Sequence, residues 1–140
     1  FALEIPDNLH HDSYLNLPLD EMMLHIQKAI ETGHPVCSEG DISEEGFIHA
    51  KDNYVDIPEN ERPVTPTSRQ EEFEQLRTTD DHVMENIGTF LKDEQRYYVC
   101  RNSAGKIWGN QGLIYLSEDY LRLKTIAVFM SEEAFLFDRK

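Results

Sequence analysis

The segment TTDDHVMENIGTFLKDEQRYYVCRNSAGKIWGNQG, residues Thr78–Gly112, decides the fold that this sequence predicts. It begins with a histidine after two aspartates, continues with two strand-like runs around a polar turn, and ends in a loop rich in glycine. In the first run we expect Val83, Glu85 and Ile87 on one face and the residues between them on the other, because successive side chains of a strand point to opposite faces of a sheet. The segment therefore predicts two strands joined as a hairpin by a polar turn over 92–96, with a tight loop after the second strand.

Two side chains at the ends of these strands suggest chemistry. His82 stands at the start of the first strand and Asn102 at the end of the second, and a hairpin brings those two ends to one edge of a sheet. A cysteine hydrolase needs a thiolate, a histidine that moves a proton, and a group that fixes the imidazole tautomer. We expect the Asn102 side-chain oxygen to accept the Nδ1 proton of His82 and to leave Nε2 facing a sulfur. Taken alone, His82 is better explained as a satisfied polar residue at a strand edge.

The remaining elements predict an α+β fold. A helix begins at Pro18 and ends before Gly33, with apolar residues at helical spacing on one face. A second helix is predicted over Ser68–Arg77, with Ser68 as its N-cap and Phe73 and Leu76 facing inward. Further strands are expected at 34–39, 97–101, 112–116 and 125–130, the last buried on both faces, and a charged excursion spans 41–67. Together they predict a small antiparallel, barrel-like sheet with flanking helices.

Composition narrows the classes of partner. The chain has 140 residues, enough for one domain, and a net charge of -14. Such a surface repels phosphate backbones, which argues against a nucleic-acid partner; ordinary solubility explains the charge equally well. No apolar run approaches the roughly 20 residues of a membrane span, and the first residues lack the apolar region of a signal sequence. Because the chain begins at Phe1, we expect a mature or truncated product.

Cysteine and histidine usage predicts neither a disulfide framework nor a metal site. Cys37 and Cys100 are far apart in the sequence and form no CxxC pattern, so two free buried thiols are expected. The adjacent His10 and His11 have no cysteine or carboxylate at a convincing metal-ligand spacing. No cofactor is indicated.

A family resemblance adds to these observations. The stretches DHVMENIG and YYVCRNSAGKIWGNQG resemble the histidine and asparagine segments of papain-like cysteine peptidases, where Asp-His-Ala/Gly precedes Asn-Ser-Trp-Gly and Trp-Gly-x-x-Gly. The stretches LNLPLDEMMLHIQKAIETGHPV, GDISEEGF, TTDDHVM and LSEDYLRLKT resemble the aminopeptidase C and bleomycin hydrolase branch. This similarity covers roughly residues 14 to 130, and the order of the motifs is more specific than any one of them.

The resemblance assigns roles by position. It implies that His82 is the general base and acid and that Asn102 orients it, with Asp81 and Trp108 as supporting residues. It also implies that residues 1–140 are the β-rich, C-terminal half of a peptidase fold that is incomplete without an N-terminal helical domain. A peptide substrate and that N-terminal half, as a separate chain or lost, are the expected partners. Formation of homo-oligomers stays open.

Two departures from the family pattern bear on activity. Ala104 stands where the family has tryptophan, so the histidine–asparagine pair is expected to be more solvated and activity lower. The family's nucleophile lies in a Gln-x-x-x-Cys-Trp context about 130–150 residues before the histidine, as in papain, whereas only 81 residues precede His82. Neither Cys37 nor Cys100 has that context, so the nucleophile is expected outside this chain.

Other readings stay open at this stage. The chain is alternatively a non-catalytic relative that keeps the fold and binds peptides. The tail from Phe135 to Lys140 is either a frayed terminus or a C-terminal arm lying in the cleft, as in the bleomycin hydrolase branch. The resemblance implies a cytoplasmic protein, but a secreted or periplasmic one is equally compatible with a missing N-terminus.

Overall fold

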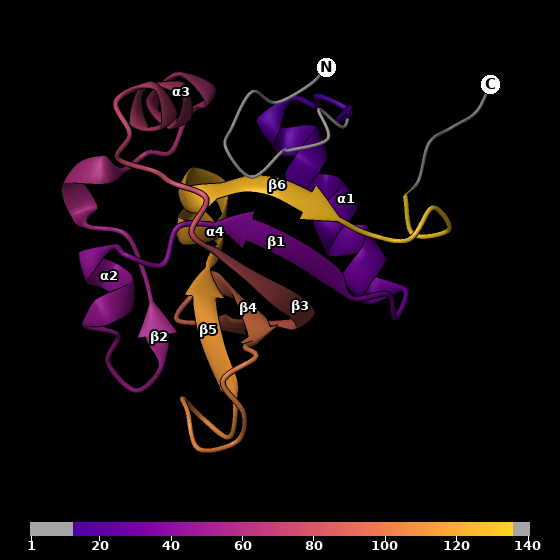
Figure 1. The fold of residues 1–140 in the computed structure, drawn as a ribbon, viewed down its shortest axis with the longest axis vertical. Helices are drawn as coiled ribbons and strands as arrows, with labels where there is room; N and C mark the ends of the chain where they lie inside the picture. Colours follow the sequence, from indigo (N-terminus) through magenta and orange to yellow (C-terminus); the bar gives the residue numbers. More distant parts are fainter. Residues whose placement is uncertain (1–12, 136–140) are drawn as a thin grey trace.

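The computed structural model describes residues 13–135, which form a six-stranded sheet with helices packed around it (Figure 1). The strand order is β2-β5-β4-β3-β1-β6, and every pair is antiparallel except the parallel pair β2–β5. The strands are β1 (Val36–Gly40), β2 (Tyr54–Val55), β3 (His82–Lys92), β4 (Gln95–Arg101), β5 (Leu113–Ser117) and β6 (Thr125–Phe129). The helices are α1 (Leu19–Glu31), α2 (Glu45–Ile48), α3 (Pro66–Glu74), α4 (Glu118–Lys124) and the 3-10 turn η1 (Glu59–Glu61).

The predicted α+β class is confirmed, but the barrel is not. The sheet is open and mixed: it ends at the two-residue strand β2 on one side and at β6 on the other. Within the described residues no ladder joins these two edges. Strand β6 is therefore an edge strand, and the prediction that it is buried on both faces is wrong: Phe129 is 48% exposed.

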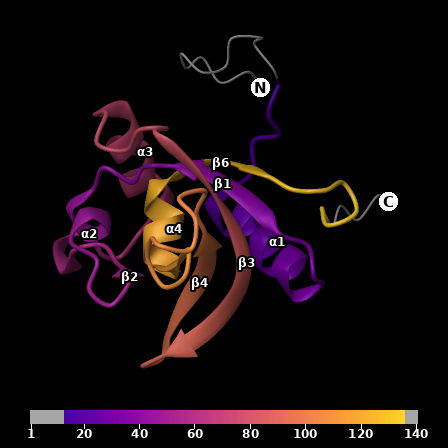
Figure 2. The ribbon, with the colours of Figure 1, turned by 60° about the horizontal axis from the view of Figure 1, so that its bottom comes forward.

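Helix α1 covers one face of the sheet, as its sequence pattern predicts (Figures 1 and 2). Pro18 is the N-cap rather than the predicted first helical residue, so the helix begins one position later, at Leu19. Asp20 and Glu21 lie in the first turn, where the helix dipole favours anions. Gly33, with a φ of 87°, ends the helix in the left-handed region. The buried face of the helix consists of Leu19, Met22, Met23, Ile26 and Ala29.

The hairpin β3–β4 is the long curved ribbon of the sheet (Figure 2). Asp93 and Glu94 connect the strands, and both have positive φ, which gives the tight two-residue turn that matches strand twist. The strands are thus longer than predicted, and the turn is shorter. A bulge at Ile87 interrupts the register between Asn86 and Gly88. Before the bulge the predicted alternation holds, with Met84 and Asn86 buried and Val83 exposed.

Helix α3 differs from its prediction at both ends. It begins after Thr65, whose side chain accepts a hydrogen bond from Ser68 N at 3.0 Å, and Ser68 is the third helical residue rather than the N-cap. Pro66 occupies the first helical position, which suits its fixed φ. The helix ends at Glu74, so Leu76 lies beyond it and is 78% exposed instead of facing inward.

The end of β1 touches α4 so closely that only glycine fits. A Cβ atom on Gly40 would lie 2.2 Å from the carbonyl oxygen of Lys124, which is backbone and cannot swing away. We expect Gly40→Ala to lower the free energy of unfolding by about 1–3 kcal/mol, since the strand or α4 must shift. Urea denaturation measures this loss.

Gly88→Ala is the matched control for Gly40→Ala. A Cβ there would meet only the Val99 side chain, at 3.7 Å, which is ordinary van der Waals contact. Equal losses in the two variants would contradict the steric explanation.

Candidate active site

His82 and Asn102 lie at the same end of the hairpin, as predicted. His82 begins β3 opposite Gly40 of β1, and Asn102 directly follows β4. Strand β4 ends with Arg101 opposite Glu85 of β3, so the antiparallel pairing brings the following Asn102 toward the start of β3, where His82 lies. The His82 Nε2 atom is 2.9 Å from Asn102 Oδ1, a normal hydrogen-bond length.

The hydrogen bond defines which imidazole nitrogen carries the proton. A side-chain carbonyl oxygen only accepts, so His82 Nε2 donates to it and Nδ1 is left with a lone pair. The prediction that Asn102 accepts the Nδ1 proton is therefore wrong, and the two nitrogens exchange roles. The reason is the direction in which the strand presents the ring, which no sequence pattern specifies.

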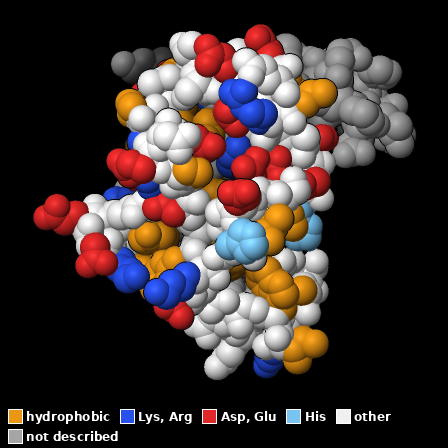
Figure 3. Space-filling model, turned by 90° about the vertical axis from the view of Figure 1, so that its left-hand side faces the viewer, with side chains coloured by type: hydrophobic (Ala, Val, Ile, Leu, Met, Phe, Trp, Pro, Cys, Tyr) orange, Lys and Arg blue, Asp and Glu red, His pale blue; other side chains and the backbone are white. Residues whose placement is uncertain are grey.

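Both side chains are only partly buried, which matches a site at a surface. The side of the molecule on the left of Figure 1 carries histidine side chains beside exposed hydrophobic side chains, with acidic side chains above them (Figure 3). Ala104, where the resemblance expects a covering tryptophan, is exposed. The small Ala104 side chain therefore does not shield the His82–Asn102 pair from proton exchange with solvent.

The loop after Asn102 is held by backbone hydrogen bonds. Asn102 N donates to Gly112 O at 3.1 Å, and Gly112 N donates to Trp108 O at 2.7 Å. The Trp108 ring stacks against Phe47 of α2, with centroids 6.3 Å apart, and packs on the core. Trp108 thus anchors the loop that follows the asparagine.

The segment before His82 is tied to the loop after β1. Asp81 N donates to Gly40 O at 3.2 Å, and Asp81 Oδ1 accepts from Ile42 N at 2.9 Å. Asp81 itself is exposed. Its contacts hold the main chain beside the histidine, which is a structural support and shows no contact with the imidazole.

A buried carboxylate that the sequence did not single out reinforces this segment. Asp41 is 3% exposed; its Oδ2 accepts from Thr79 N at 2.8 Å, and its Oδ1 accepts from Ser43 N at 2.8 Å. Burial alone would raise the pKa of Asp41, but these hydrogen bonds outweigh it and hold the pKa below its ordinary value. The turn-like Gly40-Asp41 pair was the only sequence signal.

We expect Asp41→Asn to reduce the free energy of unfolding by about 1–3 kcal/mol at neutral pH, because hydrogen bonds to a charged acceptor are lost. The lowered pKa means that the charge stabilises the fold above the unfolded-state value, and that this contribution disappears as pH falls through the folded-state value. Denaturation curves from pH 7 to about pH 3 should therefore converge for the two proteins. A constant gap across this range would contradict the ionic role.

Neither cysteine is placed as a nucleophile. Both are free, as predicted, although Cys37 is only partly buried. Cys100 is completely buried and donates to Asn86 Oδ1 at 3.0 Å, and burial raises the pKa of its thiol to about 12. A thiol with that pKa carries almost no thiolate at neutral pH, so Cys100 is a core residue.

The described residues contain no arrangement of three or more histidine, cysteine, aspartate and glutamate side chains that would hold a metal ion. His10 and His11 lie outside the described residues, as does the predicted arm beyond Phe135. Between residues 13 and 135, no helix is long and apolar enough to cross a membrane.

Comparison with known proteins relates this architecture to a peptidase. No protein-family model matches the chain, and no curated protein matches it. A solved structure does: PepW from Lactobacillus rhamnosis HN001, a cysteine peptidase of the aminopeptidase C and bleomycin hydrolase type, matches with a TM-score of 0.69 and 19% identity. The match covers 87% of this chain and 28% of PepW. At this identity the match shows the fold: this chain folds like part of PepW, in agreement with the resemblance to the papain-like cysteine peptidases.

Proposed function

We propose that this chain is the C-terminal, histidine- and asparagine-bearing part of a cysteine-type peptidase, an aminopeptidase by resemblance. His82 acts as general base and acid, and Asn102 holds its ring. The observation that carries the proposal is the 2.9 Å hydrogen bond from His82 Nε2 to Asn102 Oδ1, in a fold shared with part of PepW. It supports the proposal because it leaves Nδ1 available to a sulfur.

The chemistry follows from that tautomer. His82 Nδ1 takes the proton of a cysteine thiol, and the thiolate attacks the peptide carbonyl carbon. As the C–N bond breaks, the imidazolium returns its proton to the leaving amine and a thioester remains. His82 then accepts a proton from water, whose oxygen attacks the thioester and releases the acid and the thiol. Through each proton transfer, Asn102 keeps the ring in place without changing its own charge.

The nucleophile belongs to another part of the same enzyme in this proposal. Cys100 is buried and Cys37 lies within β1, on the strand that pairs with β3. Two apolar side chains next to candidate site residues are exposed: Val83, beside His82, at 47%, and Ile107, beside Trp108, at 99%. They support the proposal because such side chains are suited to packing against a second domain or a bound peptide.

The first test is the coding sequence upstream of Phe1 together with a peptidase assay of the whole parent protein. A Gln-x-x-x-Cys-Trp segment and aminopeptidase activity that a thiol alkylator abolishes are the expected results. Serine or glycine in place of that cysteine, with peptide binding and no turnover, would favour the non-catalytic binding module instead.

Within that parent protein, we expect Asn102→Ala to lower kcat/KM roughly 10–100-fold, because the ring loses its orientation while the imidazole remains. The pH profile should change as well, since the amide no longer stabilises one tautomer. Asn110→Ala is the control, because this asparagine lies in the same loop region and its amide donates to the Tyr115 hydroxyl. An unchanged rate and pH profile in the Asn102→Ala enzyme would contradict the proposal that Asn102 orients the His82 ring.

A further inference from the structure

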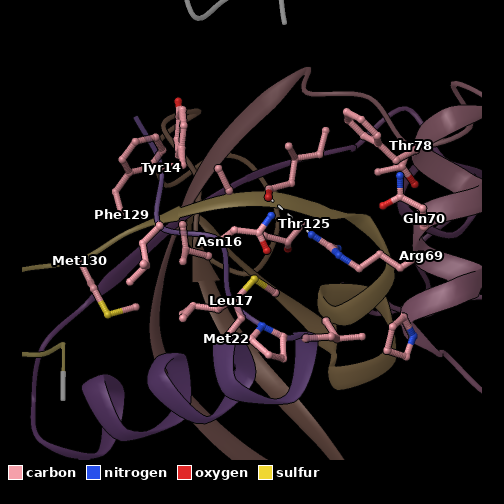
Figure 4. A pocket seen from close by; sticks show the side chains of 18 of the residues that line it. Tyr14, Asn16, Leu17, Met22, Arg69, Gln70, Thr78, Thr125, Phe129 and Met130 are labelled. Carbon is pink, nitrogen blue, oxygen red and sulfur yellow. Dashed lines mark hydrogen bonds between the residues drawn. The ribbon is translucent and has the colours of Figure 1, made fainter. Parts of the chain in front are cut away.

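A cavity of about 920 Å³ lies between the start of α1, helix α3 and strand β6 (Figure 4). Neither His82 nor Asn102 is among its lining residues. Most of its wall is apolar and includes Leu17, Met22, Phe73, Ile126, Val128 and Met130. Its size falls in the range of sites that bind small organic ligands.

The cavity contains a cation without a counter-ion. Arg69 extends from α3 toward Thr125 in Figure 4, and its guanidinium donates to Arg122 O at 2.8 Å and, weakly, to Leu123 O and Ile126 O at 3.5 Å. Among the described residues Arg69 forms no ion pair. Burial, and then the neighbouring positive Arg122, lower the pKa of Arg69 to about 10.

Lys124, a buried cation of the fold, shows how different this is. It is 2% exposed and pairs with Glu44 at 3.0 Å and Glu72 at 2.9 Å. Burying a charge without a partner is costly, so interior cations are normally paired in this way. Arg69 is partly buried and has carbonyl oxygens in place of a carboxylate partner, and the Glu132 carboxylate in the cavity wall forms no ion pair with it.

Arg69 also has unused donors. A guanidinium has five N–H groups, and the hydrogen bonds to the three carbonyl oxygens use only those on the two terminal nitrogens. Nε–H and its neighbour on Nη2 form the fork that a carboxylate binds through both oxygens.

We propose that this cavity binds a carboxylate carried on an apolar chain, with the carboxylate held by Arg69 and the chain against the apolar wall. Two sources share this chemistry: a free aliphatic acid, and the C-terminal end of a short apolar peptide. The site lies beyond the proposed peptidase chemistry and does not depend on a nucleophile.

The test is a titration of the full-length protein, followed by calorimetry, with octanoate, N-acetyl-Leu-Leu and the uncharged amide of each. We expect at least one acid to bind roughly 10–100-fold tighter than its amide, the ratio that charge-assisted hydrogen bonds provide. Preferential binding of octanoate alone would identify a free aliphatic acid as the ligand. Preferential binding of N-acetyl-Leu-Leu alone would identify a peptide C-terminus, and preferential binding of both acids would support the shared chemistry. Equal binding of acids and amides, or no binding of either acid, would overturn the proposal.

Substitutions at Arg69 test whether the acid binds at that guanidinium. Arg69→Gln should remove the preference for acid over amide, while Arg96→Gln, which changes an arginine outside the cavity wall, should retain it. Should Arg69→Gln fail to fold, Arg69→Lys supplies a second variant that keeps the charge but loses the planar fork, with an expected several-fold loss of affinity for the acids. Acid preference that persists in a folded Arg69→Gln protein, or undiminished binding of the acids by Arg69→Lys, would also overturn the proposal. Peptidase activity is a separate readout, so failure here leaves the proposed function untouched.

Discussion

We expect His82→Ala to reduce peptidase activity of the parent protein roughly 10²–10⁴-fold in kcat/KM, the usual contribution of a general acid–base group. Without the imidazole nothing takes the thiol proton at neutral pH, and nothing returns a proton to the leaving amine. The Asn102 oxygen, 2.9 Å from the ring in the native protein, has no group to orient. Steady-state kinetics with an aminoacyl fluorogenic substrate measure the loss.

The control is His49→Ala, which removes an exposed histidine just after α2. It should leave the rate unchanged, while circular dichroism shows that both variants fold. A second signature separates catalysis from structure: His82→Ala should also slow alkylation of the catalytic cysteine near neutral pH, because its thiolate loses the nearby base. Full activity in His82→Ala would contradict the assigned role.

The largest effect on stability is expected from Lys124→Ala. Lys124 Nζ donates to Glu72 Oε2 at 2.9 Å and Glu44 Oε1 at 3.0 Å. Burial alone would lower the pKa of Lys124, but the two carboxylates outweigh it and raise it. Removing Lys124 leaves Glu44 without this cation and leaves Glu72 with Arg77 alone, at 2.6 Å, and breaking a buried ion pair costs up to about 3–5 kcal/mol in the free energy of unfolding. Urea denaturation at neutral pH measures it.

Two further variants sharpen that prediction. Lys106→Ala removes an exposed lysine in the loop after Asn102, and it should change the free energy of unfolding by no more than about 0.5 kcal/mol. Lys124→Met keeps most of the side-chain volume, so a similar loss there shows that the carboxylates left without Lys124, and not a cavity, cause the effect. If Lys124→Met is as stable as the native protein, the ion pair contributes no net stability.

Local pattern was sufficient for the elements with strong local signals. The apolar stripe of α1, its ending at Gly33 and the alternation in β3 up to Asn86 all appear as predicted, because spacing in the sequence translates directly into facing. The same logic placed His82 and Asn102 at one end of a hairpin. Their roles in catalysis remain proposals.

Two predictions were wrong, for the start of α3 and for the burial of β6. Thr65 and Ser68 are both good N-caps, and the proline at position 66 made the earlier start of α3 preferable. The apolar run of β6 looked like a central strand, yet it lies at the edge, because its outer side faces the cavity near Arg69 and not another strand. Strand order depends on contacts between distant segments, which periodicity does not contain.

By itself, then, the sequence determined the α+β class, the main helix, the hairpin and the residues that meet at its end. Only the tertiary structure decided that the sheet stays open, that Nε2 of His82 and not Nδ1 points to Asn102, and that Asp41 holds the chain beside it. The tertiary structure also places two carboxylates, Glu44 and Glu72, beside Lys124, whereas Arg69 forms no ion pair within the described residues. Side-chain direction, edge pairing and charge compensation all depend on which distant residues become neighbours, and that is settled only when the chain packs.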